Sequence, residues 1–124
     1  MNAEKSYTIE TEDRGDYLWA LVGGEKLTAS IAAEYWNEIA ARCKHTKCDK
    51  VLLEKDFKIP VGPEDLIQMA KHVATVLPSC RVAFLDRRHH DSVNELGKRL
   101  ARNQDVKLQT FSDTNEAEKW LRAN

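Results

Sequence analysis

The densest group of side chains that could do chemistry is the run Asp86-Arg87-Arg88-His89-His90-Asp91, which lies between an apolar strand and a helical segment. Sheets built from alternating strands and helices usually bind ligands at the edge where such strands end. Two guanidinium groups beside the free N–H groups of a helix start favour a phosphate or a carboxylate. The first hypothesis is therefore an anion-binding loop made of Arg87, Arg88, His89 and His90, with added charge from Lys55 and Lys58 on the neighbouring loop.

The alternative is that this loop is an ordinary charged surface segment. In that case Arg87 and Arg88 would pair with the carboxylates of Asp86 and Asp91, and the loop would be solvated like most polar loops. We favour this second interpretation, because the composition of a loop is by itself weak evidence for a binding site.

The histidines raise the possibilities of a metal site and of acid-base catalysis. Adjacent residues of an extended segment point in opposite directions, so His89 and His90 are not expected to bind one ion together. Catalysis would need a carboxylate to orient the imidazole, for which Asp86 or Asp91 would serve, and a reacting group nearby. The sequence marks no such group, so we predict no catalytic residues and no cofactor.

Composition limits the class of protein further. The chain has 124 residues, which suits a single domain spanning 1–124, and its formal net charge is -1. This charge balance favours neither a nucleic acid nor an anionic membrane surface as the partner. No uncharged stretch approaches the roughly 20 residues of a membrane span, and residues 1–6 lack the basic start and apolar run of a secretory signal. We expect a cytoplasmic protein.

Three cysteines, Cys43, Cys48 and Cys80, are an odd number in a chain without an export signal, so we expect reduced thiols. Cys43 and Cys48 resemble half of a zinc site, but no second pair completes the four ligands that zinc needs. We therefore predict no metal.

The elements that must position these residues follow from the periodicity of the apolar side chains. The predicted strands are Tyr7–Thr11, Tyr17–Val22, Lys50–Glu54, Val82–Leu85 and 106–110. Gly23-Gly24 is expected to end the second strand, and a loop through Asp56, Phe57 and Pro60 to follow the third. The predicted helix starts are Thr28 or Ser30, Pro63, Asp91 or Ser92, and Asp113. Ile67 is expected on the buried stripe of the second helix. This alternation predicts an α/β fold with a mainly parallel sheet.

The second strand carries large apolar groups on both faces. Tyr17, Trp19 and Leu21 share one face, which helices packed on the other side of the sheet would leave uncovered. A second subunit, an apolar ligand or the protein's own segments would cover this face, and we predict a homodimer. An apolar pocket near Phe57, Trp19 and the Arg87-Arg88 loop is the corresponding alternative.

The order of elements and the closing phrase Phe111-Ser112-Asp113, Glu116-Ala117 and Trp120-Leu121 resemble the SpoIIAA-like branch of the STAS superfamily. The resemblance covers nearly the whole chain. It implies the order β-β-α-β-α-β-α-β-α in a superhelix of β-α turns, with a five-stranded sheet in sequential order and an antiparallel first strand. It also implies helices mainly on one face, a fold shared with the lipid-binding part of CRAL-TRIO proteins.

STAS proteins that act as anti-anti-sigma factors carry a phosphorylated serine or threonine at the start of the helix after the third strand. No hydroxyl side chain lies between Thr46 and Thr75 here. Glu64 and Asp65 could imitate a permanently charged state, but capping and the helix dipole explain carboxylates in a first helical turn adequately. The resemblance therefore implies a non-catalytic binding or regulatory module that acts through protein contacts or a small anionic ligand. The alternatives are a carrier of a small apolar or lipid-like molecule, and an enzyme that uses His89 or His90 with Asp86 or Asp91.

Overall fold

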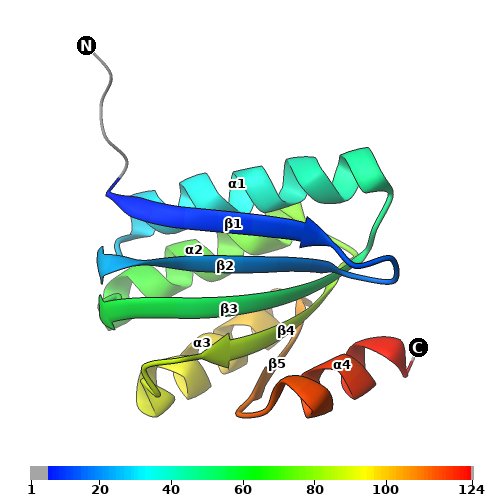
Figure 1. Cartoon of the computed structure of the whole chain (residues 1–124). Coiled ribbons are helices and arrows are strands. Elements are labelled where there is room, and N and C mark those ends of the chain that lie inside the picture. The colour runs from blue at the N-terminus through cyan, green and yellow to red at the C-terminus, as the bar shows by residue number, and fades with distance from the viewer. Residues whose placement is uncertain (1–5, 124) are drawn as a thin grey trace.

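A computed structural model describes residues 6–123 and shows an α/β fold with five strands and four helices (Figure 1). The elements are β1 Tyr7–Asp13, β2 Leu18–Lys26, α1 Ala29–Thr46, β3 Lys50–Ile59, α2 Pro63–Val76, β4 Arg81–Asp86, α3 Asp91–Asn103, β5 Lys107–Phe111 and α4 Thr114–Arg122. None of the helices within these residues combines the length and the hydropathy that a membrane span needs.

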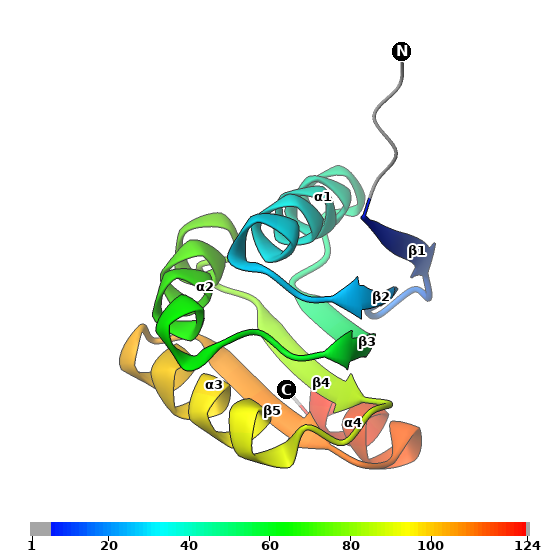
Figure 2. The same cartoon turned by 90° about the vertical axis from the view of Figure 1, so that its left-hand side faces the viewer.

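The strands lie in sequential order in one sheet. β1 pairs antiparallel with β2 through a short hairpin, and the other three pairings are parallel, each connected by a crossover helix. Helices α1, α2 and α3 form a layer on one face of the sheet, and α4 lies on the other face (Figure 2). The predicted fold class, strand order and placement of helices are confirmed.

The main core lies between the sheet and the layer of α1, α2 and α3. Side chains alternate along each strand, so every second residue of β2 and β3 points into this core. Its fully buried members include Val22, Ile39, Val51, Leu53, Phe57 and Val82. Burial of such aliphatic and aromatic side chains contributes about 1.5–3 kcal/mol each, which makes this layer the main source of stability.

A smaller core forms on the other face, beneath α4. Ala117 and Leu121 of this helix pack against Leu52, Ala83 and Leu85, and Tyr17 is buried with them. The hydroxyl of Tyr17 donates to Glu118 at 2.5 Å, and Arg122 pairs with Asp16 at 2.7 Å. The chain itself therefore covers the middle of the face on which a dimer was predicted.

Local signals for the helix starts at Thr28, Pro63 and Asp113 are confirmed. The Thr28 side chain accepts from the Ile31 N–H at 3.1 Å, and Asp113 accepts from Asn115 at 3.3 Å. Pro63 begins α2 at a position where its missing N–H has no cost.

The prediction that Gly23-Gly24 ends the second strand is wrong, because β2 continues to Lys26. A Cβ on Gly23 would lie 2.9 Å from the carbonyl oxygen of Asp56, and one on Gly24 would lie 3.0 Å from that of Ser6. Only glycine allows the neighbouring backbones to approach this closely. The glycines therefore sustain strand pairing here.

The prediction of a loop after Glu54 is also wrong. β3 runs to Ile59, and its residues Lys55, Asp56 and Phe57 pair with the extended part of β2 or with the end of β4. This correction changes the surroundings of two residues predicted to bind a ligand, Lys55 and Phe57.

Candidate functional site

The edge where β3 and β4 end is organised around the carboxylate of Asp86, whose side chain is almost fully buried. Its Oδ1 accepts from the backbone N–H of Arg88 at 2.9 Å. Its Oδ2 accepts from the backbone N–H of His90 at 3.0 Å and from Asn94 Nδ2 at 2.8 Å, and lies 3.1 Å from His90 Nδ1. One carboxylate thus holds the loop between β4 and α3 and the first turn of α3.

The protonation of Asp86 follows from these contacts. Burial by itself would raise the pKa of this carboxyl, but the hydrogen bonds from Asn94 and from the backbone N–H groups of Arg88 and His90 favour the charged form. The positive charge of Lys55 acts in the same direction, and the net effect holds the pKa of Asp86 below its ordinary value. The carboxylate is therefore negatively charged, and both of its oxygens accept hydrogen bonds from within the chain.

The arginines of the predicted anion site are paired within the chain, but not with Asp86 or Asp91. Arg87 lies 3.2 Å from Glu54, and Arg88 lies 2.6 Å from Asp56. Both carboxylates belong to β3, which was expected to have ended before Asp56. The arginines do pair with carboxylates of the same chain, as the alternative interpretation predicts. The predicted partners, Asp86 and Asp91, are wrong.

The histidines are held differently from each other. His90 contacts Asp86 through its ring, whereas His89 is exposed and adopts a left-handed backbone with φ of 55°. His89 borders a polar cleft of about 280 Å³ between the β4–α3 loop and the end of β5, together with Asp86, Asp91, Asn94 and Ser112. The predicted caps of α3 are wrong, since His90 is the N-cap residue and no side chain caps the helix.

The prediction that Lys55 belongs to a solvated loop is wrong. Lys55 lies inside β3 and is only 6% exposed. Its ammonium group lies 4.8 Å from the centre of the Phe84 ring. Burial lowers the pKa of Lys55 to about 8, although the charge of Asp86 raises it in part. Lys58 is exposed and pairs with Glu25 at 3.3 Å. Lys55 and Lys58 are therefore not part of one cluster with the arginines.

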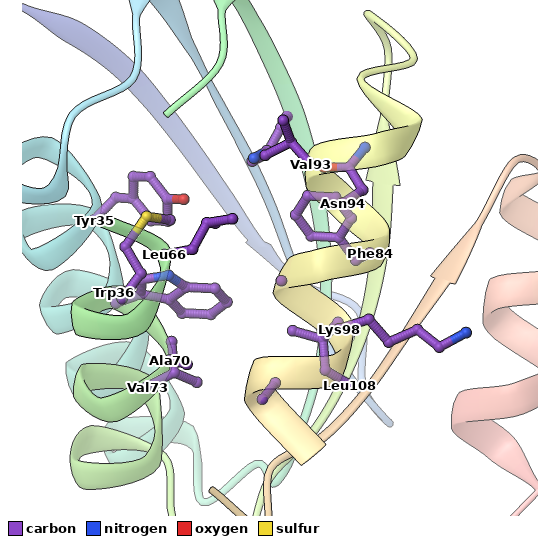
Figure 3. A pocket seen from close by; sticks show the side chains of 14 residues that line it. Tyr35, Trp36, Leu66, Ala70, Val73, Phe84, Val93, Asn94, Lys98 and Leu108 are labelled. Atoms are coloured by element: carbon purple, nitrogen blue, oxygen red, sulfur yellow. The ribbon is translucent and has the colours of Figure 1, made fainter. Parts of the chain in front are cut away.

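A cavity of about 60 Å³ lies beside Lys55, between the sheet and the helices α1, α2 and α3. Figure 3 shows Tyr35, Trp36 and Leu66 on one side of it and Phe84, Val93 and Asn94 on the other. The remaining wall is made of Met69, Ala70, Val73, Gly97, Lys98, Ala101 and Leu108. Its walls come from the six elements α1, β3, α2, β4, α3 and β5.

The residues of the predicted apolar interface are divided between the two faces of the sheet. Phe57 is 1% exposed in the main core and stacks on Tyr35, with ring centres 6.4 Å apart. Trp19 and Leu21 are half-buried on the opposite face, where Trp19 donates to Glu54 at 2.6 Å and lies beneath Arg14. The predicted grouping of Phe57 with Trp19 is wrong, because alternation along the extended β3 turns Phe57 inward. The homodimer stays a prediction.

Cys43 is buried in the main core and Cys80 packs against it, and these two residues and Cys48 are free thiols. Among residues 6–123, no group of three or more His, Cys, Asp or Glu side chains is placed to hold a metal ion.

The segment that joins β3 to α2 exposes two large apolar side chains. Ile59 is 45% exposed at the end of β3 and Ile67 is 47% exposed on α2, so the prediction that Ile67 is buried is wrong. Leu66 and Ala70 turn toward the core instead. Glu64 and Asp65 occupy the first turn of α2, where the helix dipole favours negative charge.

Sequence reasoning missed three features of this region: the burial of Lys55, the cavity wall formed by Asn94 and Gly97, and the exposed Ile59. A signal for the first was present, because Leu53, Lys55 and Phe57 alternate with the polar residues Glu54, Asp56 and Lys58. Period-two alternation extended past Glu54 would have placed Lys55 on the inner face. The cavity itself depends on how α2 and α3 pack, which has no local signal.

The sequence matches no protein-family profile and no curated protein. Solved structures do resemble it. An anti-sigma factor antagonist from Mycobacterium paratuberculosis superimposes with a TM-score of 0.62 at 12% identity, covering 98% of this chain and 99% of that one. An uncharacterized protein of the DUF3478 family with a SpoIIAA-like fold, from Shewanella loihica PV-4, superimposes with a TM-score of 0.56 at 16% identity, covering 98% of both chains. These likenesses span almost the full length of each chain, and they agree with the resemblance found in the sequence. The protein therefore has the SpoIIAA-like fold.

Proposed function

We propose that this protein is a non-catalytic binding module that contacts a partner protein through the segment from Ile59 to Ile67. We call this segment the junction surface. The observation that carries the proposal is that the segment exposes two isoleucines of a chain whose other large apolar side chains are at least half-buried within residues 6–123. The two isoleucines stand at the two ends of one short segment, and apolar side chains left exposed to solvent are candidates for the centre of a protein contact.

The fold supports this proposal. One solved structure with the same fold is an anti-sigma factor antagonist, a name that describes action on another protein. In the STAS superfamily the start of the helix after the third strand carries the regulatory hydroxyl, and the corresponding helix here is α2. The junction surface therefore lies where phosphorylation-regulated relatives of this fold are switched.

The chemistry of the junction surface favours a contact that does not depend on a kinase. Its residues contain no hydroxyl side chain, and the first turn of α2 carries the acidic residues Glu64 and Asp65. A partner with a basic rim around an apolar patch would complement both features. We infer constitutive binding, limited by the concentration of the partner.

The polar edge at Asp86 supports a structural role for the loop rather than catalysis. A general base needs a free lone pair directed at the substrate, whereas the carboxylate of Asp86 already accepts hydrogen bonds from Arg88, His90 and Asn94. The guanidinium groups of Arg87 and Arg88 are likewise engaged by β3.

The test is a comparison of partner retention by matched variants. The double variant Ile59→Ser with Ile67→Ser removes the apolar contacts from the junction surface. The control variant, Asn115→Ser with Lys119→Ser, makes two exposed changes on α4. Affinity purification from cells that express the protein, with quantitative mass spectrometry, should show a partner that the wild type and the control retain and that the junction variant loses. Equal retention by all three proteins would contradict the proposal.

A second function, binding of a small ligand, is favoured by a separate observation. The cavity between α2 and α3 has the buried amine of Lys55 in its wall. This arrangement lies on the inner side of the sheet and does not involve the exposed isoleucines.

A further inference from the structure

We propose that the cavity beside Lys55 binds a small monocarboxylate, whose carboxylate contacts the Lys55 ammonium group and whose apolar body lies between α2 and α3. This inference rests on the second candidate function, ligand binding, and is independent of the protein contact at the junction surface.

The first argument is the missing partner of Lys55. Lys55 is only 6% exposed. Among residues 6–123 its ammonium group takes part in no hydrogen bond or ion pair, and it lies 4.8 Å from the centre of the Phe84 ring, with the charge of Asp86 acting at longer range. The nearest carboxylate, that of Asp86, is already occupied by other donors. A buried charge without an acceptor is costly, and a carboxylate brought by a ligand would remove that cost.

The second argument is the composition of the cavity wall. Apart from Lys55, Asn94 and Lys98, the wall is aliphatic, aromatic or glycine, as Figure 3 shows for most of its members. Such a wall suits a hydrocarbon chain or an aryl ring and offers few hydrogen bonds to a sugar or a polar metabolite. The ligand class is therefore an anion with an apolar body.

The third argument concerns charge and size. Lys98 forms an ion pair with Glu95 at 3.4 Å, so Lys55 is the cation of the wall that is left for a ligand. Asp86 on the neighbouring strand would repel a second negative charge on that ligand. A monoanion fits this balance better than a phosphate dianion. A volume of about 60 Å³ corresponds to roughly four to six waters, so the buried part of the ligand is a short chain or a single ring.

The experiment uses hexanoate as the probe and hexan-1-ol as its neutral analogue. Binding to the intact protein is followed by NMR shifts of the backbone amides of Val93 and Gly97. Lys55→Met removes the charge and keeps an apolar side chain of similar length. Lys98→Met is the matched control on the same wall, and Ala70→Leu fills the cavity.

Hexanoate should bind the wild type with a Kd of about 1 mM, as expected for a ligand of this size. Lys55→Met should weaken the binding of hexanoate at least tenfold and leave the affinity for hexan-1-ol unchanged. Lys98→Met should change neither affinity. Ala70→Leu should abolish the binding of both probes. The proposal is overturned if the wild type shows no response to hexanoate up to about 10 mM, or if Lys55→Met binds hexanoate as tightly as the wild type. Melting temperatures measured on the same samples separate loss of binding from loss of folding.

The two proposals fail separately. Lys55→Met should retain the partner captured through the junction surface, and the Ile59→Ser, Ile67→Ser variant should retain hexanoate. A variant that loses both activities would show that the two sites are one.

Discussion

Lys55 and Asp86 occupy partner positions on β3 and β4, yet no ion pair joins their charged groups. The carboxylate of Asp86 turns to the loop that follows β4, and the ammonium group of Lys55 turns to the ring of Phe84 beside the cavity. Two opposite charges at neighbouring buried positions normally pair, because pairing offsets the cost of removing them from water. This separation is the premise of the proposed carboxylate site beside Lys55.

Replacement of Lys55 by methionine should stabilise the protein. The pKa of Lys55 falls from 10.5 in the unfolded chain to about 8 in the fold, so the charged form costs roughly 3 kcal/mol. We expect a gain of about 1–3 kcal/mol in the free energy of unfolding at neutral pH, measured by urea denaturation.

The pH dependence of this gain follows from the sign of the shift. The folded state binds the proton more weakly than the unfolded state, so the cost is fully present below pH 8 and disappears above pH 10.5. Lys55→Met and the wild type should therefore converge in stability as the pH rises. The exposed control Lys58→Met should change stability by less than about 0.5 kcal/mol at any pH. A destabilised Lys55→Met protein would refute this account of the buried charge.

Asp86→Asn should destabilise the protein by about 2 kcal/mol or more, because an amide cannot replace a carboxylate as acceptor for all the donors of the loop. The folded pKa of Asp86 is lower than its unfolded value of 3.8, so its stabilisation is present above that value and is lost as the pH falls through the folded pKa.

Acid titration of stability tests this prediction. The variant should show a shallower loss of stability than the wild type below about pH 4, and Asp91→Asn, at the exposed first residue of α3, should behave like the wild type. Identical acid limbs for Asp86→Asn and the wild type would contradict the role of this carboxylate.

Gly97→Ala should stabilise the protein by about 0.5–1 kcal/mol, since glycine is a poor residue for the interior of a helix. The added Cβ would lie 3.7 Å from Leu66 Cδ2, which is an ordinary contact across the cavity. A rise in the urea midpoint with an unchanged slope would support this prediction, whereas a fall would show that α2 and α3 pack more closely than the structure indicates.

Gly23→Ala should have the opposite effect and destabilise the protein by about 1–3 kcal/mol. Its Cβ would lie 2.9 Å from the carbonyl oxygen of Asp56, and a backbone atom of a paired strand cannot easily move away. The same urea experiment compares the two glycine variants directly. Equal stabilities of Gly23→Ala and the wild type would mean that β2 and β3 are not paired this closely.

Features set by neighbouring residues were predictable from the sequence. Thr28, Pro63 and Asp113 mark helix starts through contacts within the first turn of each helix, and the order of elements follows from the periodicity of apolar residues. These local signals, with the Phe111 to Leu121 phrase, were enough for the fold. Phe111 and Trp120 of that phrase pack together, with ring centres 5.7 Å apart.

Features set by contacts between distant segments were not predictable in the same way. Gly23 usually predicts the end of a strand, and only the close carbonyl of Asp56 explains why the strand continues. Charge usually predicts exposure, and for Lys55 this signal is misleading, because the alternation along β3 turns its side chain inward. The ion-pair partners of Arg87 and Arg88 depend on how far β3 extends. The exposure of Ile67 depends on the rotation of α2 about its axis.

The most direct test of the proposed function is site-specific photo-crosslinking in cells that express the protein. A photoreactive amino acid at position 67, on the junction surface, should yield a discrete crosslinked product with one partner protein, and the same amino acid at position 119 on α4 should not. Absence of any product from position 67, or the same products from both positions, would contradict a contact through the junction surface.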